Sequence, residues 1–455
     1  MEISPTCPNT HTFDKNRCLC IPKNLEKTQK VKPECKPGKQ KNANGRCVKI
    51  RNTTVKLTAK PDVMTTVIPN IGTVEEKMTS KMIMDMVSNK NTSVQISTKV
   101  MSVHSFSPSI NKRILSLHNS PRENIFQCND SSNEVRWSSL NRKSLPLISI
   151  GTGKDGKAIC KPMDSKKGKE ILLRNIRNTT VDENQIITPV QRKSNCWFNT
   201  FFVTFFISDK GRKFFRYFRE MMVTGNHADG TKIKPQLAKS LLLLNACIEA
   251  SYGNQDIAMA MDTNNVISNI YDVIPSKKYN YNVKPVGRSG NPWNYYKTIM
   301  RYMNNNDIKY LEIDKTEYNE MEKSPTERKQ YKHLPELLVC VFYDDDCKDM
   351  KYQERKQMAG PNGEIGLYVL DSAIVRDTKK RHFCALITIN GNKYGFDGVS
   401  HSRMIAFDWK KHIFTDDGVK SEWTFEGSIF NKNKKKPIKW SFSSAVHMLF
   451  YYRVQ

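Results

Sequence analysis

The sequence predicts an α+β fold, made of a helical part and an antiparallel sheet, and three stretches carry that prediction. Between residues 191 and 222 phenylalanines recur every three or four positions, which is typical of a helix with a broad buried face. Residues 234–252 repeat leucine and isoleucine at the same spacing and predict a second helix. Residues 367–397 instead indicate strands at 367–375, 383–389 and 393–397, with Asn390 and Gly391 as a strong hairpin-turn signal between the last two. A further buried strand is predicted at 337–343, and the polar stretch 253–336 is predicted to be irregular apart from a short helix near 293–303.

The composition indicates that only part of the 455-residue chain forms a packed core. Hydrophobic residues make up 38%, which is low for a wholly globular chain. Residues 51–110 are polar, with few aromatic residues and no sustained period, so we predict a disordered linker there. We interpret residues 111–190 as an N-terminal extension and residues 191–455, where aromatic residues become frequent, as the main domain.

The charge balance favours contact with polyanions. The chain has 73 Lys and Arg against 45 Asp and Glu, a formal net charge of +28. Its first residues lack the apolar core of a signal peptide, and no apolar run approaches the ~20 residues of a membrane-spanning helix. We therefore expect a protein that is neither secreted nor membrane-bound, with most of its 12 cysteines as reduced thiols.

Residues 1–50 form a small cysteine-rich module. Cys7 and Cys18 enclose one polar segment and Cys35 and Cys47 another, and both pairs end in an Arg-Cys step, as in a diverged tandem repeat. A disulfide or a zinc ion could hold so small a unit together, although the spacing is not that of a standard zinc-binding pair. A disordered tail with incidental cysteines is the alternative.

Residues 151–158, GTGKDGKA, approach a phosphate-binding loop without completing it. That loop needs a Ser or Thr hydroxyl to hold magnesium, and Ala158 stands in this place. We interpret the segment as a glycine-rich turn between strands at 147–150 and 158–160, followed by a short basic helix at 169–178. No cofactor is expected.

Cys196 is the candidate nucleophile, because it stands at the start of the aromatic helix. The positive end of a helix dipole favours the thiolate, which is the reactive form of cysteine. Ser194 and Asn195 can cap the first helical turn. The alternative is that Cys196 is a small apolar core residue, as most free cysteines are.

His382 and Asp397 are its candidate partners. His382 opens one strand of the hairpin and Asp397 ends the return strand, so antiparallel pairing places them across from each other. A carboxylate there can hold one imidazole nitrogen while the other faces a thiol. None of the other histidines outside the poorly ordered N-terminal part has such a setting. The alternative for His382 is a histidine at a strand end without a role, and the alternative for Asp397 is a turn residue before Gly398.

Four motifs together resemble a ubiquitin-specific protease over residues 191–453: SNCWFNTFF, YVLDSAIV, RHFCALITINGNKYGFDG and the terminal HMLFYYR. The resemblance implies a papain-like fold, with the cysteine on a helical lobe and the histidine and aspartate on a sheet lobe. It implies Cys196 as nucleophile, His382 as general base and Asp397 as the residue that orients it. The implied partner is ubiquitin or a ubiquitinated protein, cleaved at the isopeptide bond after the Gly-Gly tail of ubiquitin.

The sequence also departs from that family. Gln191 replaces the asparagine of the oxyanion hole five positions before the cysteine, and its amide can donate in the same way; Asn195 is the second candidate. The zinc-holding CxxC pairs are absent, and Cys340 with Cys347 alone makes no site, so no metal is expected. The cysteine motif also resembles ovarian-tumour-type deubiquitinases, although Lys193 replaces the aspartate of their motif.

The N-terminal segment CKPGKQKNANGRCVK resembles the two-cysteine adaptor of large, iridovirus-like DNA viruses. That resemblance implies other viral proteins as partners, and the host cytoplasm or the virion as location. Two other functions stay open: a basic structural virion protein, favoured by the net charge and the lysine run at 432–436, and a protease that processes viral precursors on the same fold.

Candidate acidic patches for the basic face of ubiquitin are residues 344–346 and the trio Glu317, Glu320 and Glu322.

Overall fold

The computed structural model describes residues 11–14, 19–22, 39–41, 47–49, 122–128, 140–178, 180–227, 229–253, 255–275, 282–305, 308–321, 323, 331–431 and 436–455. The chain divides into two compact units, Met1–Ser97 and Thr98–Gln455. In the first, β1 (His11–Asp14) pairs with β2 (Leu19–Pro22) and β3 (Lys39–Lys41) with β4 (Cys47–Lys49), both antiparallel. The predicted linker and the state of Cys7, Cys18, Cys35 and Cys47 lie outside what is described.

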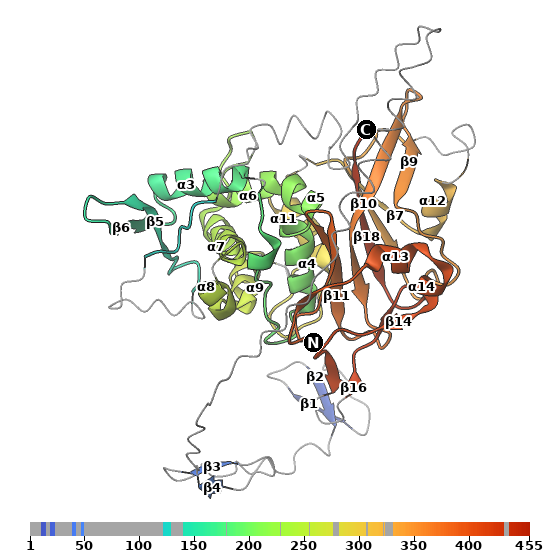
Figure 1. Cartoon of the computed structure of the whole chain (residues 1–455), viewed down its shortest axis with the longest axis horizontal. Coiled ribbons are helices and arrows are strands. Elements are labelled where there is room, and N and C mark those ends of the chain that lie inside the picture. Colours follow the sequence, from blue (N-terminus) through green and yellow to red (C-terminus); the bar gives the residue numbers. More distant parts are fainter. Residues whose placement is uncertain are drawn as a thin grey trace, which may run out of the picture. The chain divides into compact units, whose positions relative to one another are not determined.

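Apart from α12 (Lys315–Glu320), α13 (Trp409–Phe414) and α14 (Asp416–Lys420), which lie on the other side, the described helices of the second unit gather on one side of its main sheet (Figure 1). The aromatic stretch forms α4, whose 11 residues are all buried, and the helices predicted at 234–252 and near 293–303 are α7 and α11. The helices on this side are α3 (Lys166–Arg177), α4 (Cys196–Phe206), α5 (Asp209–Phe214), α6 (Arg216–Thr224), α7 (Pro235–Ser251), α8 (Gln255–Ala260), α9 (Thr263–Tyr271) and α11 (Pro292–Tyr302). The mixed α+β composition is thus as predicted.

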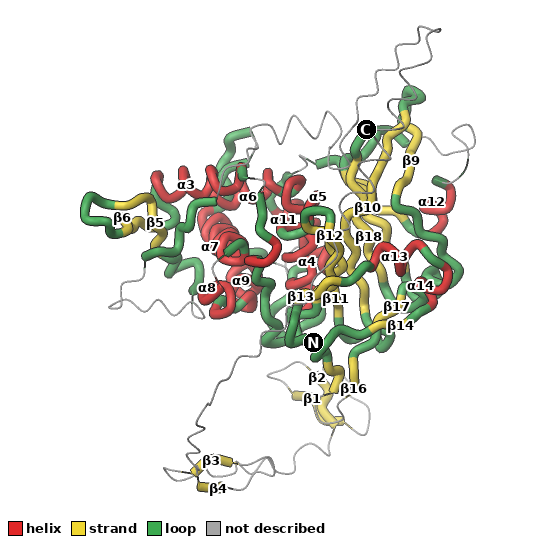
Figure 2. The backbone as a smooth tube through the Cα atoms, in the orientation of Figure 1, coloured by secondary structure: helices red, strands yellow, loops and turns green. Residues whose placement is uncertain are grey.

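The main sheet has eight strands in the order β13-β12-β11-β10-β18-β8-β7, with β9 also paired to β10 (Figure 2). The pairs are antiparallel except that of β7 with β8. The strands are β7 (Tyr310–Ile313), β8 (Leu337–Phe342), β9 (Arg355–Ala359), β10 (Ile365–Arg376), β11 (Phe383–Ile389), β12 (Asn392–Phe396), β13 (Met404–Ala406) and β18 (His447–Arg453). The strands predicted at 337–343, 367–375, 383–389 and 393–397 are confirmed to within two residues.

Both faces of this sheet are covered. Successive side chains of a strand point to opposite faces, and Phe450 packs with the helices listed above while Leu449 and Tyr451 belong to a second cluster. The second cluster includes residues of α12 (Lys315–Glu320), α13 (Trp409–Phe414) and α14 (Asp416–Lys420). Burial on both faces explains why the central strands read as nearly continuous apolar runs. The shorter elements are η3 (Glu183–Gln185), β14 (Glu422–Trp423), β15 (Ile429–Asn431), β16 (Lys436–Pro437) and β17 (Trp440–Ser441).

The extension before the cysteine helix is attached to the helical part. Its β5 (Leu147–Thr152) and β6 (Ala158–Pro162) pair antiparallel, which confirms the predicted glycine-rich turn. Cys128 and Cys160 form a disulfide, so these two are not reduced thiols, whereas Cys196, Cys247, Cys340, Cys347 and Cys384 are free. The guanidinium of Arg122 donates to the buried carboxylate of Glu249 on α7 at 2.5 Å, which ties the extension to the helices.

Residues 253–336, which we predicted to be largely irregular, are more ordered than the sequence indicated. They contain α8, α9, β7 and α12 besides the predicted helix α11. Asp262 and Asp314 cap α9 and α12 by accepting backbone N–H groups. Helices this short show too little apolar periodicity to be recognised, and only their caps point to them. None of the described helices is long and apolar enough to cross a membrane.

Candidate active site

Cys196 is the first residue of α4, where the dipole argument requires it, and 8% of its surface is exposed. The predicted side-chain cap by Asn195 is wrong. Asn195 occupies the N-cap position, but its side chain makes no capping bond and its amide donates instead to the hydroxyl of Thr263 on α9 at 2.9 Å. The first turn of α4 is therefore held through the Asn195 carbonyl, which accepts the N–H of Phe198 and of Asn199.

His382 and Asp397 face each other across the mouth of the β11–β12 hairpin. The two turn residues Asn390 and Gly391 both have left-handed backbones, with φ of 49° and 83°, as a tight two-residue hairpin turn requires. The register that follows from this turn brings His382 Nε2 within 2.5 Å of Asp397 Oδ1. The predicted juxtaposition of the imidazole and the carboxylate is therefore present in the structure.

The side chain of Cys196 lies close enough to the His382 imidazole to interact with it, so the structure brings all three residues together. Because Nε2 faces Asp397, Nδ1 is the ring nitrogen left for the thiol. Burial lowers the pKa of His382, but the hydrogen bonds and charges of Asp397 and Cys196 outweigh it and raise the pKa to about 10. The imidazole therefore holds a proton strongly, as the group that takes the proton of Cys196 must.

Asp397 is fixed by two further donors besides the imidazole. The backbone N–H of Val399 donates to Oδ1 at 3.1 Å, and the hydroxyl of Ser428 donates to Oδ2. The carboxylate has no exposed surface. A carboxylate held by several hydrogen bonds keeps one orientation, which in turn fixes the ring of His382. No signal in the sequence points to Ser428, because it lies 31 positions from Asp397 in a segment without a motif.

Asp377 holds the backbone of His382 in place. Its buried carboxylate accepts the N–H groups of His382 at 2.8 Å and of Arg381 at 2.5 Å, and its own N–H donates to the His382 carbonyl at 2.9 Å. These bonds close a tight loop directly before β11. In the sequence this segment shows only a run of charged residues, although an aspartate in a polar loop often bonds the backbone a few residues on.

The two candidates for the oxyanion hole fare differently. Gln191 lies beside the site, since its backbone N–H donates to the Gly398 carbonyl at 3.0 Å. The side-chain oxygen of Gln191 is buried and accepts no hydrogen bond from the described residues. Asn195 is fully buried and its amide points to Thr263. This geometry argues against the Asn195 side chain as an oxyanion donor, and we retain Gln191.

A second junction between α4 and the hairpin lies at the end remote from Cys196. Asp209, the first residue of α5, accepts the backbone N–H groups of Asn390 and Gly391, each at 3.0 Å. Arg212 pairs with the same carboxylate at 2.8 Å. The helix that carries the thiol is thereby joined to the turn of the hairpin that carries the imidazole.

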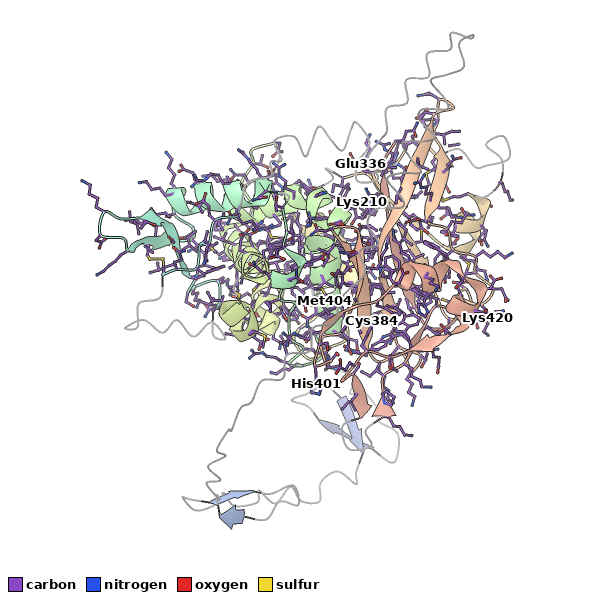
Figure 3. All side chains as sticks on the ribbon, in the orientation of Figure 1. Lys210, Glu336, Cys384, His401, Met404 and Lys420 are labelled. Carbon is purple, nitrogen blue, oxygen red and sulfur yellow. A yellow bond between two sulfur atoms is a disulfide. The ribbon has the colours of Figure 1, made fainter. Side chains whose placement is uncertain are left out.

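The neighbouring residues strengthen this junction. The Ser208 hydroxyl donates to Asp371 on β10 at 2.6 Å and accepts the N–H of Thr388 on β11 at 3.2 Å. Asp371 also accepts the N–H of Lys210 at 3.0 Å. In Figure 3, Lys210 lies above Cys384, which is near the start of β11. The position of α4 relative to the β11–β12 hairpin is thus fixed both at the Cys196 end of the helix and at its C-terminal end.

Replacing Asp209 is expected to slow catalysis rather than only to weaken the fold. We expect Asp209→Asn to lower kcat by about 10-fold and Asp209→Ala by about 10²-fold, because a shift of ~1 Å between reacting groups costs this much. The rate at which iodoacetamide alkylates Cys196 should fall in parallel. As control, Asp229→Asn removes an exposed turn aspartate bonded to Thr231 and should change neither rate. A lower melting temperature with unchanged kcat would restrict Asp209 to a structural role.

The structure contains another Cys–His pair, and its surroundings differ. Cys347 Sγ lies 3.2 Å from Nδ1 of His447, and both residues are fully buried. Burial raises the pKa of Cys347 to about 12 and lowers that of His447 to about 4. Both are therefore uncharged near neutral pH, and this pair fits a packing role.

The candidate acidic patches are partly neutralised. Asp344 forms an ion pair with Lys380, and Asp345 lies 3.3 Å from Lys348. Glu322 lies outside the described residues. Within the described ranges, no group of three or more His, Cys, Asp or Glu could hold a metal ion.

Comparison with solved structures finds a distant likeness to modules that contain Ubp8. The SAGA DUB module of Ubp8, Sgf11, Sus1 and Sgf73 bound to monoubiquitin matches with a TM-score of 0.36 and 10% identity, over 68% of this chain and 79% of that chain. The Ubp8-Sgf11-Sgf73-Sus1 SAGA DUB module matches with a TM-score of 0.35 and 11% identity, over 68% and 78%. The yeast SAGA DUB module with an Sgf73 mutant matches at 0.33 and 10%, over 68% and 78%. No protein-family model matches the chain, and no curated protein matches its sequence.

Proposed function

We propose that the protein is a thiol-dependent peptidase of papain-like fold, in which Cys196 is the nucleophile, His382 the general acid and base, and Asp397 the group that orients the imidazole. The observation that carries this proposal is the position of His382, whose imidazole interacts with Cys196 and is held by the buried carboxylate of Asp397. A nucleophile bonded to a base that a third group orients is the arrangement that covalent catalysis requires.

The chemistry follows from this arrangement. His382 takes the proton of Cys196, and the thiolate attacks the substrate carbonyl to form a tetrahedral intermediate. Gln191 and the backbone N–H of Cys196 are the proposed donors to its oxyanion. The imidazolium then gives its proton to the leaving amine, and the acyl-enzyme remains. Water, activated by His382, hydrolyses the thioester and regenerates the thiol.

The proposed substrate is a ubiquitin conjugate, cleaved after the Gly-Gly tail of ubiquitin. This finer assignment is supported by the resemblance of the cysteine, histidine and closing-strand motifs to ubiquitin-specific proteases. The viral adaptor and the viral partners that the N-terminal motif implies are proposed on the resemblance of that segment alone. A precursor-processing peptidase on the same fold is the second candidate.

The test is reaction of the full chain with a ubiquitin-vinyl-sulfone probe, followed by mass spectrometric mapping of the adduct. We expect a single adduct on Cys196. Cys347, which also sits beside a histidine, is the internal control and should stay unmodified. Cleavage of peptides without probe labelling would favour the precursor-processing function. Absence of both activities would overturn the peptidase proposal and favour a structural role.

A further inference from the structure

Three loops carry the proposed site residues, and all three are basic. They are residues 191–195 before Cys196, residues 377–381 before His382 and residues 398–403 after Asp397; we call them the site loops. Their basic residues are Arg192, Lys193, Lys379, Lys380, Arg381, His401 and Arg403. Their one acidic residue, Asp377, is buried and bonds the backbone of its own loop.

Positively charged side chains come from the loops on both the cysteine side and the aspartate side of the site. Arg192, on the cysteine side, donates to the carbonyls of Met259 at 3.0 Å and Ala260 at 3.3 Å at the end of α8. Arg403, on the aspartate side, lies 3.0 Å from the sulfur of the same methionine. Two guanidinium groups from opposite loops thus converge on Met259, which is 40% exposed. Neither guanidinium forms an ion pair among the salt bridges of the described residues.

The loop before His382 adds a basic pocket. A pocket of about 140 Å³ is lined by Asp377, Thr378, Lys379, Lys436, Pro437, Ile438 and Lys439. Lys439 pairs with Glu422 at 2.7 Å, and Lys380 pairs with Asp344, so some of the local charge is balanced. Lys379, Arg381 and Lys436 are also exposed on this side.

We propose that the protein acts on an acidic polypeptide stretch, with Asp or Glu side chains within a few residues of the bond that Cys196 attacks. This inference rests on the proposed peptidase function and adds its substrate class. Carboxylates bound at the site loops would meet cations on both sides of the thiol, and a lysine-rich stretch would be repelled. A ubiquitin conjugate would then be cleaved best where the acceptor lysine lies in an acidic stretch of the modified protein.

The test uses internally quenched peptides with a central Gly-Gly, in which the flanking positions are all Asp, all Asn or all Lys. We expect the full chain to cleave the Asp series at least 10-fold faster, in kcat/KM, than the Lys series, since each exposed ion pair contributes up to about 5-fold. Because exposed charges are screened, the ratio should shrink between about 50 mM and about 300 mM salt. Cys196→Ala should abolish cleavage of every series.

Reversing the charge of two site-loop residues tests whether the preference for acidic peptides comes from these loops. Lys193→Glu combined with Arg381→Glu should lower the rate for the Asp series and raise it for the Lys series. Lys420→Glu is the matched control, because this exposed lysine on α14 lies away from His401 of the site loops (Figure 3), and it should leave the ratio unchanged.

The outcomes separate this inference from the proposed function. Equal rates for the Asp and Lys series, or faster cleavage of the Lys series, would overturn the acidic substrate while leaving the peptidase intact. Labelling of Cys196 by the ubiquitin probe without cleavage of any peptide would do the same. Neither labelling nor cleavage would overturn both.

Discussion

Replacing Cys196 or His382 with alanine is expected to lower kcat/KM by about 10⁴- to 10⁶-fold, and replacing both should cost no more than either alone. The thiol and the imidazole act as one unit, since His382 interacts with Cys196 and is the group that takes its proton. Once either is missing, the other has no proton to exchange and contributes nothing further. The measurement is kcat/KM of the two single variants and the double variant with a fluorogenic ubiquitin or peptide substrate.

The second Cys–His pair supplies the control for this experiment. Cys347→Ala and His447→Gln remove a pair of the same residue types that is fully buried and uncharged. We expect these variants to lower the melting temperature, because they leave a cavity or an unpaired polar group, but to keep kcat close to that of the wild type. If the fold-losses in kcat/KM of the Cys196 and His382 single variants multiply in the double variant, the two residues act independently. That result would contradict the prediction that they act as one unit.

The parts of this site that could be predicted from sequence depend on local signals. The phenylalanine spacing identified α4 and placed Cys196 at its first residue. Asn390 and Gly391 both adopt the left-handed conformation that few other residues tolerate, so they fixed the turn of the hairpin and with it the pairing of His382 with Asp397. Each of these signals lies within a few residues of the element that it defines.

The parts that could not be predicted depend on contacts between distant segments. Ser428 reaches Asp397 over 31 positions, and Asp209 reaches Gly391 over 182. A single sequence carries no signal for which carboxylate will meet which N–H at such separations. Asn195 shows the same limit in reverse: its position favoured a helix cap, but Thr263 on α9 engages its amide instead. Tertiary contacts override a local preference that amounts to about 1 kcal/mol.

Replacing Asp397 with asparagine is expected to lower kcat by about 10²- to 10⁴-fold while the backbone stays in place. Asparagine has nearly the same shape, but it is neutral and its amide can present either a donor or an acceptor to His382. The imidazole then loses the charge that stabilises its protonated form and the fixed acceptor that orients it. With the amide oxygen in the Oδ1 position, the Val399 N–H keeps its acceptor. The Ser428 hydroxyl can rotate to accept a hydrogen bond from the amide NH2 in the Oδ2 position, so the loop should keep its conformation.

The pH dependence gives this prediction a definite sign. Burial lowers the pKa of His382, and the bonds and charges of Asp397 and Cys196 raise it to about 10, above the ordinary value of 6.5. A group whose pKa is raised by folding stabilises the protein fully below about pH 6.5, and this stability is lost as the pH rises toward 10. In Asp397→Asn the lowering effect of burial persists while the main raising partner is gone, so the imidazolium loses its proton at lower pH.

Two measurements should therefore move together in Asp397→Asn. The free energy of unfolding should differ most from the wild type near pH 6.5, with the difference narrowing as the pH approaches 10. The alkaline limb of the kcat/KM profile, which reports ionisation of the free enzyme, should shift to lower pH. An alkaline limb that stays where it is in the wild type, despite the lower kcat, would mean that Asp397 does not set the protonation of His382, and the role proposed for the carboxylate would have to be abandoned.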